Sequence, residues 1–176
     1  MEWDDEVWAS RHQLLCRCWI SRIYHQKRER FYDMCDALTK AISVIGGTAA
    51  VSRLVGADSM VLAGAAITVT STASLVLGYA KKARSHADLA KAFTDLEARI
   101  VAKGVFDEAQ ANAFQAEIIK IEIAEPRSLG ALVRICQNEL AFAQGHPDMV
   151  KPVRFWQRLF AHLYDFDLSA APRIKS

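Results

Sequence analysis

Glycine and proline are scarce in this chain, which has 8 and 4 of them among its 176 residues. No stretch shows sustained alternation of polar and apolar residues with the period of two that is typical of a half-buried strand. Apolar residues recur at helical spacing instead, as in Leu89, Phe93, Leu96 and Ile100. We therefore expect a chain that is nearly all helix.

Metal-binding and catalytic motifs are also missing. Four cysteines are present, at Cys16, Cys18, Cys35 and Cys136. None belongs to a C-x-x-C pair of the kind that binds zinc, so we expect no metal site and interpret them as small apolar residues. No H-E-x-x-H, G-x-S-x-G or phosphate-loop motif occurs. We expect no catalytic residues and no cofactor, and conclude that an enzyme is disfavoured.

Charged residues are absent from positions 59–80. As a helix, this run is about 33 Å long, which is enough to cross a hydrocarbon core of about 30 Å. A surface helix needs a polar face, so such a run favours a membrane over a soluble core. A first apolar arm, residues 41–52, is only about 18 Å long and spans fully only if Lys40 and Arg53 extend to the interface. Together, residues 41–80 predict a two-helix transmembrane hairpin.

Small and hydroxyl-bearing residues on both arms predict close packing between helices, or the lining of a pore. These candidate positions are Gly46, Gly47, Ala50, Gly64, Thr68, Ser71 and Thr72. Small residues let helices approach closely in lipid, and hydroxyl groups can form hydrogen bonds across helices. The alternative is that each hydroxyl bonds to the preceding turn of its own helix.

Cationic and polar residues flank the apolar arms and predict a membrane interface. The candidates are Lys40, Arg53, Lys81, Lys82, Arg84 and His86. Lys27, Arg28 and Arg30 precede the first arm and Lys81, Lys82 and Arg84 follow the second, whereas the short connection holds only Arg53 and Asp58, so the positive-inside rule places both termini in the cytoplasm. The lipid bilayer is therefore the expected partner.

The predicted organisation has four parts: a basic amphipathic N-terminal helix (1–40), the membrane hairpin (41–80), a cytosolic helical region (81–167) and a flexible tail (168–176). Within the cytosolic region we expect four helices. The first ends near Gly104, the second covers 107–124, the third runs from Ser128 to Gly145, and the last starts at Pro152. The N-terminal helix interleaves aromatic and basic residues, but nearby carboxylates cancel much of its charge. We therefore expect no nucleic-acid partner.

This pattern resembles the SLATT group of bacterial two-transmembrane effectors over roughly residues 8–145. Beyond the two apolar arms, the residues that carry the resemblance are Lys81, Lys82, His86, Leu89, Ala90, Phe93, Leu96, Ile100, Glu125, Pro126, Leu132, Cys136, Asn138, Glu139 and Gly145. A single Pro126 followed by Arg127 stands where that group has a more proline-rich step, and the first arm is shorter than its pattern.

The resemblance implies an effector of a bacterial conflict or anti-phage system. Such a protein forms homo-oligomers in the inner membrane and opens a pore or disrupts the bilayer, and a separate sensor or signal-producing protein supplies its trigger. The alternative is a soluble all-helical interaction module, such as an adaptor or an inhibitor, in which the apolar hairpin is the buried central pair.

Overall fold

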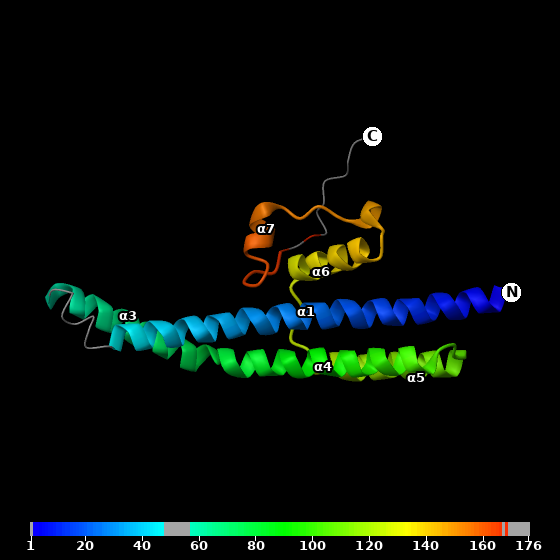
Figure 1. Cartoon of the computed structure of the whole chain (residues 1–176), viewed down its shortest axis with the longest axis horizontal. Helices are drawn as coiled ribbons and strands as arrows, with labels where there is room; N and C mark the ends of the chain where they lie inside the picture. The colour runs from blue at the N-terminus through cyan, green and yellow to red at the C-terminus, as the bar shows by residue number, and fades with distance from the viewer. Residues whose placement is uncertain (1, 48–56, 167, 169–176) are drawn as a thin grey trace. The chain divides into compact units, whose positions relative to one another are not determined.

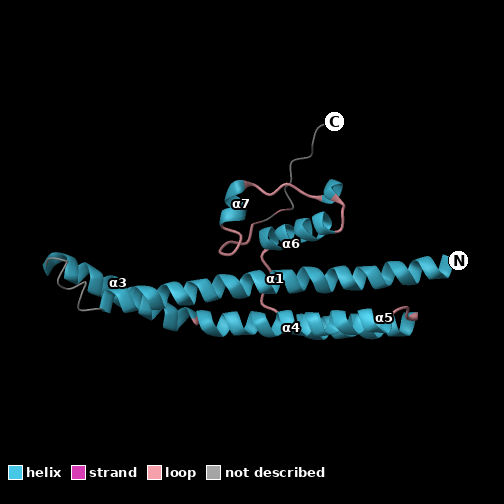
Figure 2. Ribbon diagram, in the orientation of Figure 1, coloured by secondary structure: helices cyan, strands magenta, loops and turns pink. Residues whose placement is uncertain are grey.

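The computed structural model describes residues 2–47, 57–166 and 168, and all regular secondary structure within them is helical (Figure 2). Figure 1 shows the helices in chain order: α1 (Glu2–Gly47), α3 (Ala57–Leu77), α4 (Tyr79–Lys103), α5 (Glu108–Glu122), α6 (Gly130–Ala143), the 3₁₀ helix η1 (Pro147–Met149) and α7 (Phe155–Leu159). The predicted all-α class is confirmed.

The chain divides into two compact units. Unit 1 contains the residues up to Gln26 together with those from Ala87 onward, and unit 2 contains Lys27–His86. The helices α1 and α4 each contribute residues to both units. Unit 2 therefore contains the predicted hairpin and the helical residues on either side of it.

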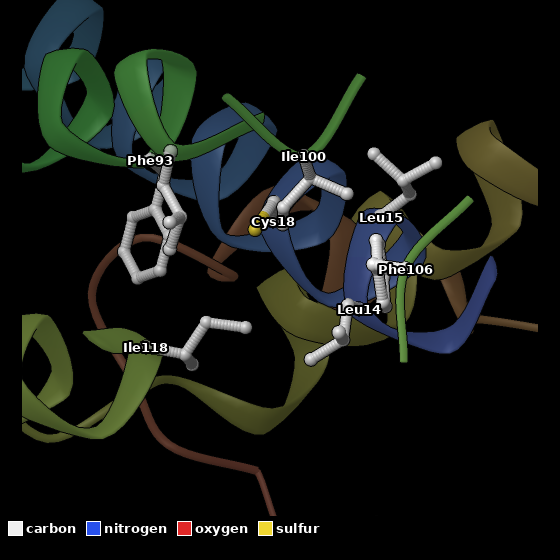
Figure 3. Packing of buried hydrophobic residues seen from close by; sticks show 8 residues of the cluster. Leu14, Leu15, Cys18, Phe93, Ile100, Phe106 and Ile118 are labelled. Atoms are coloured by element: carbon white, nitrogen blue, oxygen red, sulfur yellow. The ribbon is translucent and has the colours of Figure 1, made fainter. Parts of the chain in front are cut away.

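Unit 1 has a conventional hydrophobic core, part of which is shown in Figure 3. Its first cluster consists of Leu14, Leu15, Cys18, Phe93, Leu96, Ile100, Phe106 and Ile118. The predicted stripe of α4 is confirmed, because Phe93, Leu96 and Ile100 are fully buried. Each large apolar side chain buried in this way contributes about 1.5–3 kcal/mol relative to an exposed one. A second cluster of unit 1 consists of Tyr24, Ala131, Leu132, Cys136 and Ala161.

Local signals at the helix ends explain where α4, α5 and α6 stop and start. Gly104 has φ of 73° and follows the last residue of α4, and Gly145 has φ of 78° just beyond α6. This left-handed backbone region is open to glycine at little cost. The Asp107 side chain caps α5 by accepting a 2.8 Å hydrogen bond from the backbone N–H of Gln110. These ends agree with the predicted ones to within a few residues.

Two predicted helices differ from the observed ones. The N-terminal helix does not end at residue 40, since α1 continues without interruption to Gly47. The last helix was expected from Pro152 through an apolar stripe of Val153, Trp156, Leu159, Phe160 and Leu163, but α7 covers only Phe155–Leu159 and turns follow it. Trp156, Leu159 and Leu163 of that stripe are exposed instead of buried.

None of the helices within the described residues combines the length and the hydrophobicity that crossing a membrane requires. The transmembrane assignment of residues 41–80 thus has no support from the helices that are described. On the first arm, Asp36 and Lys40 are charged, and the described helical residues that follow Lys40, up to Gly47, span only about 10 Å.

Candidate functional site

In unit 2, the C-terminal part of α1 and the helix α3 lie side by side (Figure 1). Hydroxyl groups connect them. Ser43 and Ser71 are hydrogen-bonded through their Oγ atoms at 2.9 Å, and the Thr39 hydroxyl donates to Ser74 Oγ at 3.3 Å. We call these four residues the hydroxyl seam. They place polar contacts between the two helices, where a water-soluble helix pair normally places apolar side chains.

Large apolar side chains of the same helices are exposed. They are Met34, Leu38, Val44 and Ile45 on α1 and Val69, Leu75, Val76 and Leu77 on α3. Leu75 and Val76 are exposed to 85% and 78%. Single exposed apolar residues are common in proteins, whereas a large contiguous patch is typical of surfaces that contact lipid or another protein. Among the described residues of unit 2, hydroxyl pairs thus link the two helices, while these large apolar side chains and cations such as Lys40 and Lys81 are exposed.

Several described hydroxyls of unit 2 also bond within their own helix. Those of the seam residues Thr39 and Ser43 lie 2.8 and 2.9 Å from the carbonyls of Asp36 and Thr39. Thr68 Oγ1 donates to the Gly64 carbonyl at 2.9 Å, and Thr70 Oγ1 donates to the Ala66 carbonyl at 2.8 Å. Such bonds to the preceding turn leave no free donor and let a hydroxyl lie in an apolar environment. Of the predicted packing hydroxyls, Ser71 therefore joins the two helices and Thr68 bonds within its own turn. Thr72 is exposed.

The predicted glycine positions occupy different places. Gly46 and Gly47 form the end of α1. A Cβ atom added to Gly64 would meet no heavy atom within 4 Å, so Gly64 faces open space in the single chain. Gly64 thus has no close-packed neighbour among the described residues. Ala50, like Arg53 of the predicted interface, lies outside the described residues.

The predicted interface residues separate into exposed cations and a buried histidine. Lys81, Lys82 and Arg84 are exposed near the start of α4. Lys40 is exposed on α1, and its Nζ lies 2.6 Å from the Asp36 carboxylate one turn away. His86, by contrast, is only 3% exposed.

Tyr32, which the sequence did not single out, stacks on His86 and contacts Arg28, one of the basic residues expected to flank the hairpin. The rings of His86 and Tyr32 are stacked, with centroids 5.6 Å apart and an interplanar angle of 14°. The buried Arg28 guanidinium lies 4.6 Å from the centroid of the Tyr32 ring and donates a hydrogen bond to its hydroxyl. Lys82 Nζ lies 5.7 Å from the same ring. Cations near an aromatic face are stabilised by its quadrupole, so Tyr32 fixes two cations at one end of unit 2. In the sequence, this contact was indicated by the four-residue spacing of Arg28 and Tyr32, which places both side chains on the same face of a helix.

Unit 1 uses much of the basic face of α1 for internal ion pairs. Arg17 forms a bidentate contact with Glu122, with nitrogen–oxygen distances of 2.8 and 2.5 Å. Arg22 Nε lies 3.2 Å from Glu97, and the buried His25 lies 3.1 Å from Glu125. These arginines are therefore directed at carboxylates of the same chain.

Unit 1 contains three of the four cysteines, and Cys16 Sγ lies 3.3 Å from His12 Nε2. The only strongly shifted thiol among the described residues is Cys18, where burial and the Glu97 carboxylate raise the pKa from 9.0 to about 11. A thiol with a raised pKa is a poor nucleophile at neutral pH. In the part of the chain that is described, no three His, Cys, Asp or Glu side chains are grouped so that they could hold a metal ion.

Comparison of the chain with models of protein families, with curated proteins and with solved structures finds no match.

Proposed function

We propose that this chain is a membrane effector of a bacterial conflict system, and that unit 2 is its membrane-active part. The observation that carries the proposal is the distribution of polarity in unit 2. Hydroxyl groups join α1 and α3 on the inside, and residues such as Leu75 and Val76 are exposed on the outside. Water opposes this arrangement and lipid favours it, because lipid solvates apolar side chains and leaves polar groups to pair with each other.

The proposal does not require either helix to cross the bilayer. The apolar outer faces of both helices can enter one leaflet, as amphipathic helices do at a membrane surface. Exposed cations at Lys40, Lys81, Lys82 and Arg84 support this location, because they can reach the phosphate groups of the lipids. The expected site is the bacterial inner membrane, with both termini on the cytoplasmic side.

Disruption of the bilayer then follows from assembly of several copies. Gly64 and Thr68 are exposed on α3, and they leave room for the close approach of another helix. The resemblance to the SLATT group supports the same activity, a homo-oligomer that opens or disrupts the inner membrane. It also supports a separate sensor or signal-producing protein as the source of the trigger.

Cell fractionation tests the membrane location. The full chain should sediment with membranes and resist extraction at high salt, whereas the Leu75→Asn/Val76→Asn variant should shift to the soluble fraction. Val101→Asn is the matched control, because Val101 is a half-exposed valine of unit 1 and should leave the distribution unchanged. Recovery of the unaltered chain in the soluble fraction without detergent would exclude the proposal.

A soluble all-helical interaction module is the second candidate. It is favoured by the two hydrophobic clusters and the buried His25–Glu125 pair of unit 1, which are typical of a domain that folds in water. In this case a second protein covers the apolar surface of unit 2. The same fractionation separates the two candidates, since only the second one predicts a soluble complex whose mass exceeds that of one chain.

A further inference from the structure

The C-terminal segment of unit 1 exposes a second group of large apolar side chains. We call it the aromatic patch, and it consists of Phe155, Trp156, Leu159, Phe160, Leu163 and Tyr164. All six are more than 40% exposed, and Phe155 and Leu163 are exposed to 69% and 67%. The patch belongs to α7 and the turns that follow it.

The aromatic patch is held in a defined conformation. The ring of Trp156 is stacked on Phe160, with centroids 6.2 Å apart, and its edge contacts Phe155 at 5.4 Å. Ala161, in the same segment, is only 1% exposed and belongs to the second hydrophobic cluster. The segment is thus attached to the core through a small residue, while its large side chains remain exposed.

Polar contacts to α6 attach both ends of this segment. The Asn138 side chain donates to the Lys151 carbonyl at 2.6 Å and accepts from the Lys151 N–H at 2.9 Å. At the other end, Asp165 Oδ1 accepts a 3.0 Å hydrogen bond from the N–H of Gly130. Because these contacts already order the segment, it loses less conformational entropy when a partner binds.

The surface of the segment has an excess of cations. Between Asp148 and Asp165 the charged residues are Lys151, Arg154 and Arg158, and all three are exposed. The Asp165 carboxylate, at the end of the segment, lies 3.2 Å from the Arg127 guanidinium and is paired with it. A surface that combines exposed aromatic rings with an excess of cations is complementary to an anionic partner.

We propose that the aromatic patch binds the surface of an anionic lipid bilayer. Trp and Tyr prefer the level of the lipid headgroups, and lysine and arginine bind the phosphate groups there. The aliphatic Leu159 and Leu163 distinguish lipid from nucleic acid, because they can enter the acyl region but cannot stack on bases. This contact belongs to unit 1 and does not depend on insertion of unit 2.

Vesicle flotation with the full chain tests the proposal. The experiment uses the full chain with the substitutions Leu75→Asn and Val76→Asn, which weaken any binding through unit 2. This variant should bind vesicles made of equal parts phosphatidylglycerol and phosphatidylcholine, and bind vesicles of phosphatidylcholine alone roughly tenfold or more weakly. Adding Trp156→Ser/Phe160→Ser should weaken binding to the anionic vesicles by about tenfold or more. Val105→Ser, at an exposed valine of unit 1, is the matched control and should have no effect.

Two further measurements identify the residues and the partner. Trp156→Phe should preserve binding but remove the part of the tryptophan fluorescence that brominated lipids quench. Arg154→Glu/Arg158→Glu should reduce binding to anionic vesicles about tenfold or more without changing the circular dichroism. Equal binding to both kinds of vesicle, unchanged binding of Trp156→Ser/Phe160→Ser, or binding of a single-stranded oligonucleotide in place of vesicles would each overturn the proposal. Fractionation of the unaltered chain tests unit 2 separately.

Discussion

At the scale of single residues, Cys18 shows how packing changes chemistry. Its side chain is fully buried in the first cluster of unit 1, next to residues such as Leu15 and Phe93. Removal from water disfavours the thiolate, and the negative charge of Glu97 disfavours it further. The pKa of the thiol is consequently raised to about 11.

The raised pKa of Cys18 predicts a loss of stability in alkali. Between pH 9 and pH 11 the unfolded thiol loses its proton while the folded one keeps it. The folded state then binds more protons, so the free energy of unfolding falls as the pH rises, by about 1–3 kcal/mol. Urea unfolding at pH 8 and at pH 11 measures the decrease. Other groups also titrate in this range, so the Cys18→Ala variant is the control, and it should show a decrease that is smaller by this amount. Equal decreases would contradict the prediction.

At the scale of helices, one glycine separates α3 from α4. Gly78 has φ of 58°, although its N–H bonds to the Ser74 carbonyl at 3.0 Å as in a continuing helix. A Cβ atom meets no neighbour at this position, so only the backbone conformation requires glycine. The left-handed region costs other residues about 1–2 kcal/mol.

Gly78→Ala should therefore destabilise the protein by about 1 kcal/mol. Gly64→Ala is a matched control, because Gly64 also faces open space but lies within α3 without a positive φ. Alanine is the better helix former there and should stabilise the protein slightly, by about 0.5–1 kcal/mol. Thermal unfolding of both variants measures the two effects. Opposite signs are expected, and a loss of stability in both would contradict this explanation of the junction.

The sequence predicted helices well where apolar periodicity and end signals agree. The stripe of α4 and its end at Gly104 were predicted because each turn buries one apolar residue and a glycine follows. The continuity of α1 was not predicted, because residues 36–41 carry no signal that distinguishes a junction from a helix interior. The extent of α7 was overestimated, since an apolar stripe such as Trp156, Leu159 and Leu163 does not reveal whether it has a partner to pack against.

The sequence predicted which types of residue occur in the candidate site, but not which residues contact each other across the helices. Ser71 was predicted as a packing position, and its partner Ser43 was not. Partners on different helices depend on how the helices are rotated about their axes, and one helix alone does not contain that information. The cluster of Arg28, Tyr32 and His86 was missed for the same reason, because His86 is far from the other two in sequence.

At the scale of the whole molecule, the two units differ in how their described helices are joined. Unit 1 has two hydrophobic clusters as well as the exposed aromatic patch, whereas α1 and α3 of unit 2 are joined through hydroxyls and expose large apolar residues such as Leu75 and Val76. Coverage by lipid or protein would remove these exposed apolar residues of unit 2 from water. We infer that unit 2 carries the activity and that copies of the chain meet through it.

Gly64→Leu and Thr68→Leu test this assembly. Both positions are exposed on α3, and the space around Gly64 is open, so the larger side chain should leave the fold of the single chain intact. If copies pack closely through this face, leucine separates their helices and abolishes the growth arrest that expression of the chain is expected to cause. Growth curves measure the activity, and circular dichroism confirms folding. Ala65→Leu is the control, because it adds a similar side chain on the neighbouring face of α3 and should leave toxicity unchanged. Toxicity that survives both substitutions would exclude packing through Gly64 and Thr68.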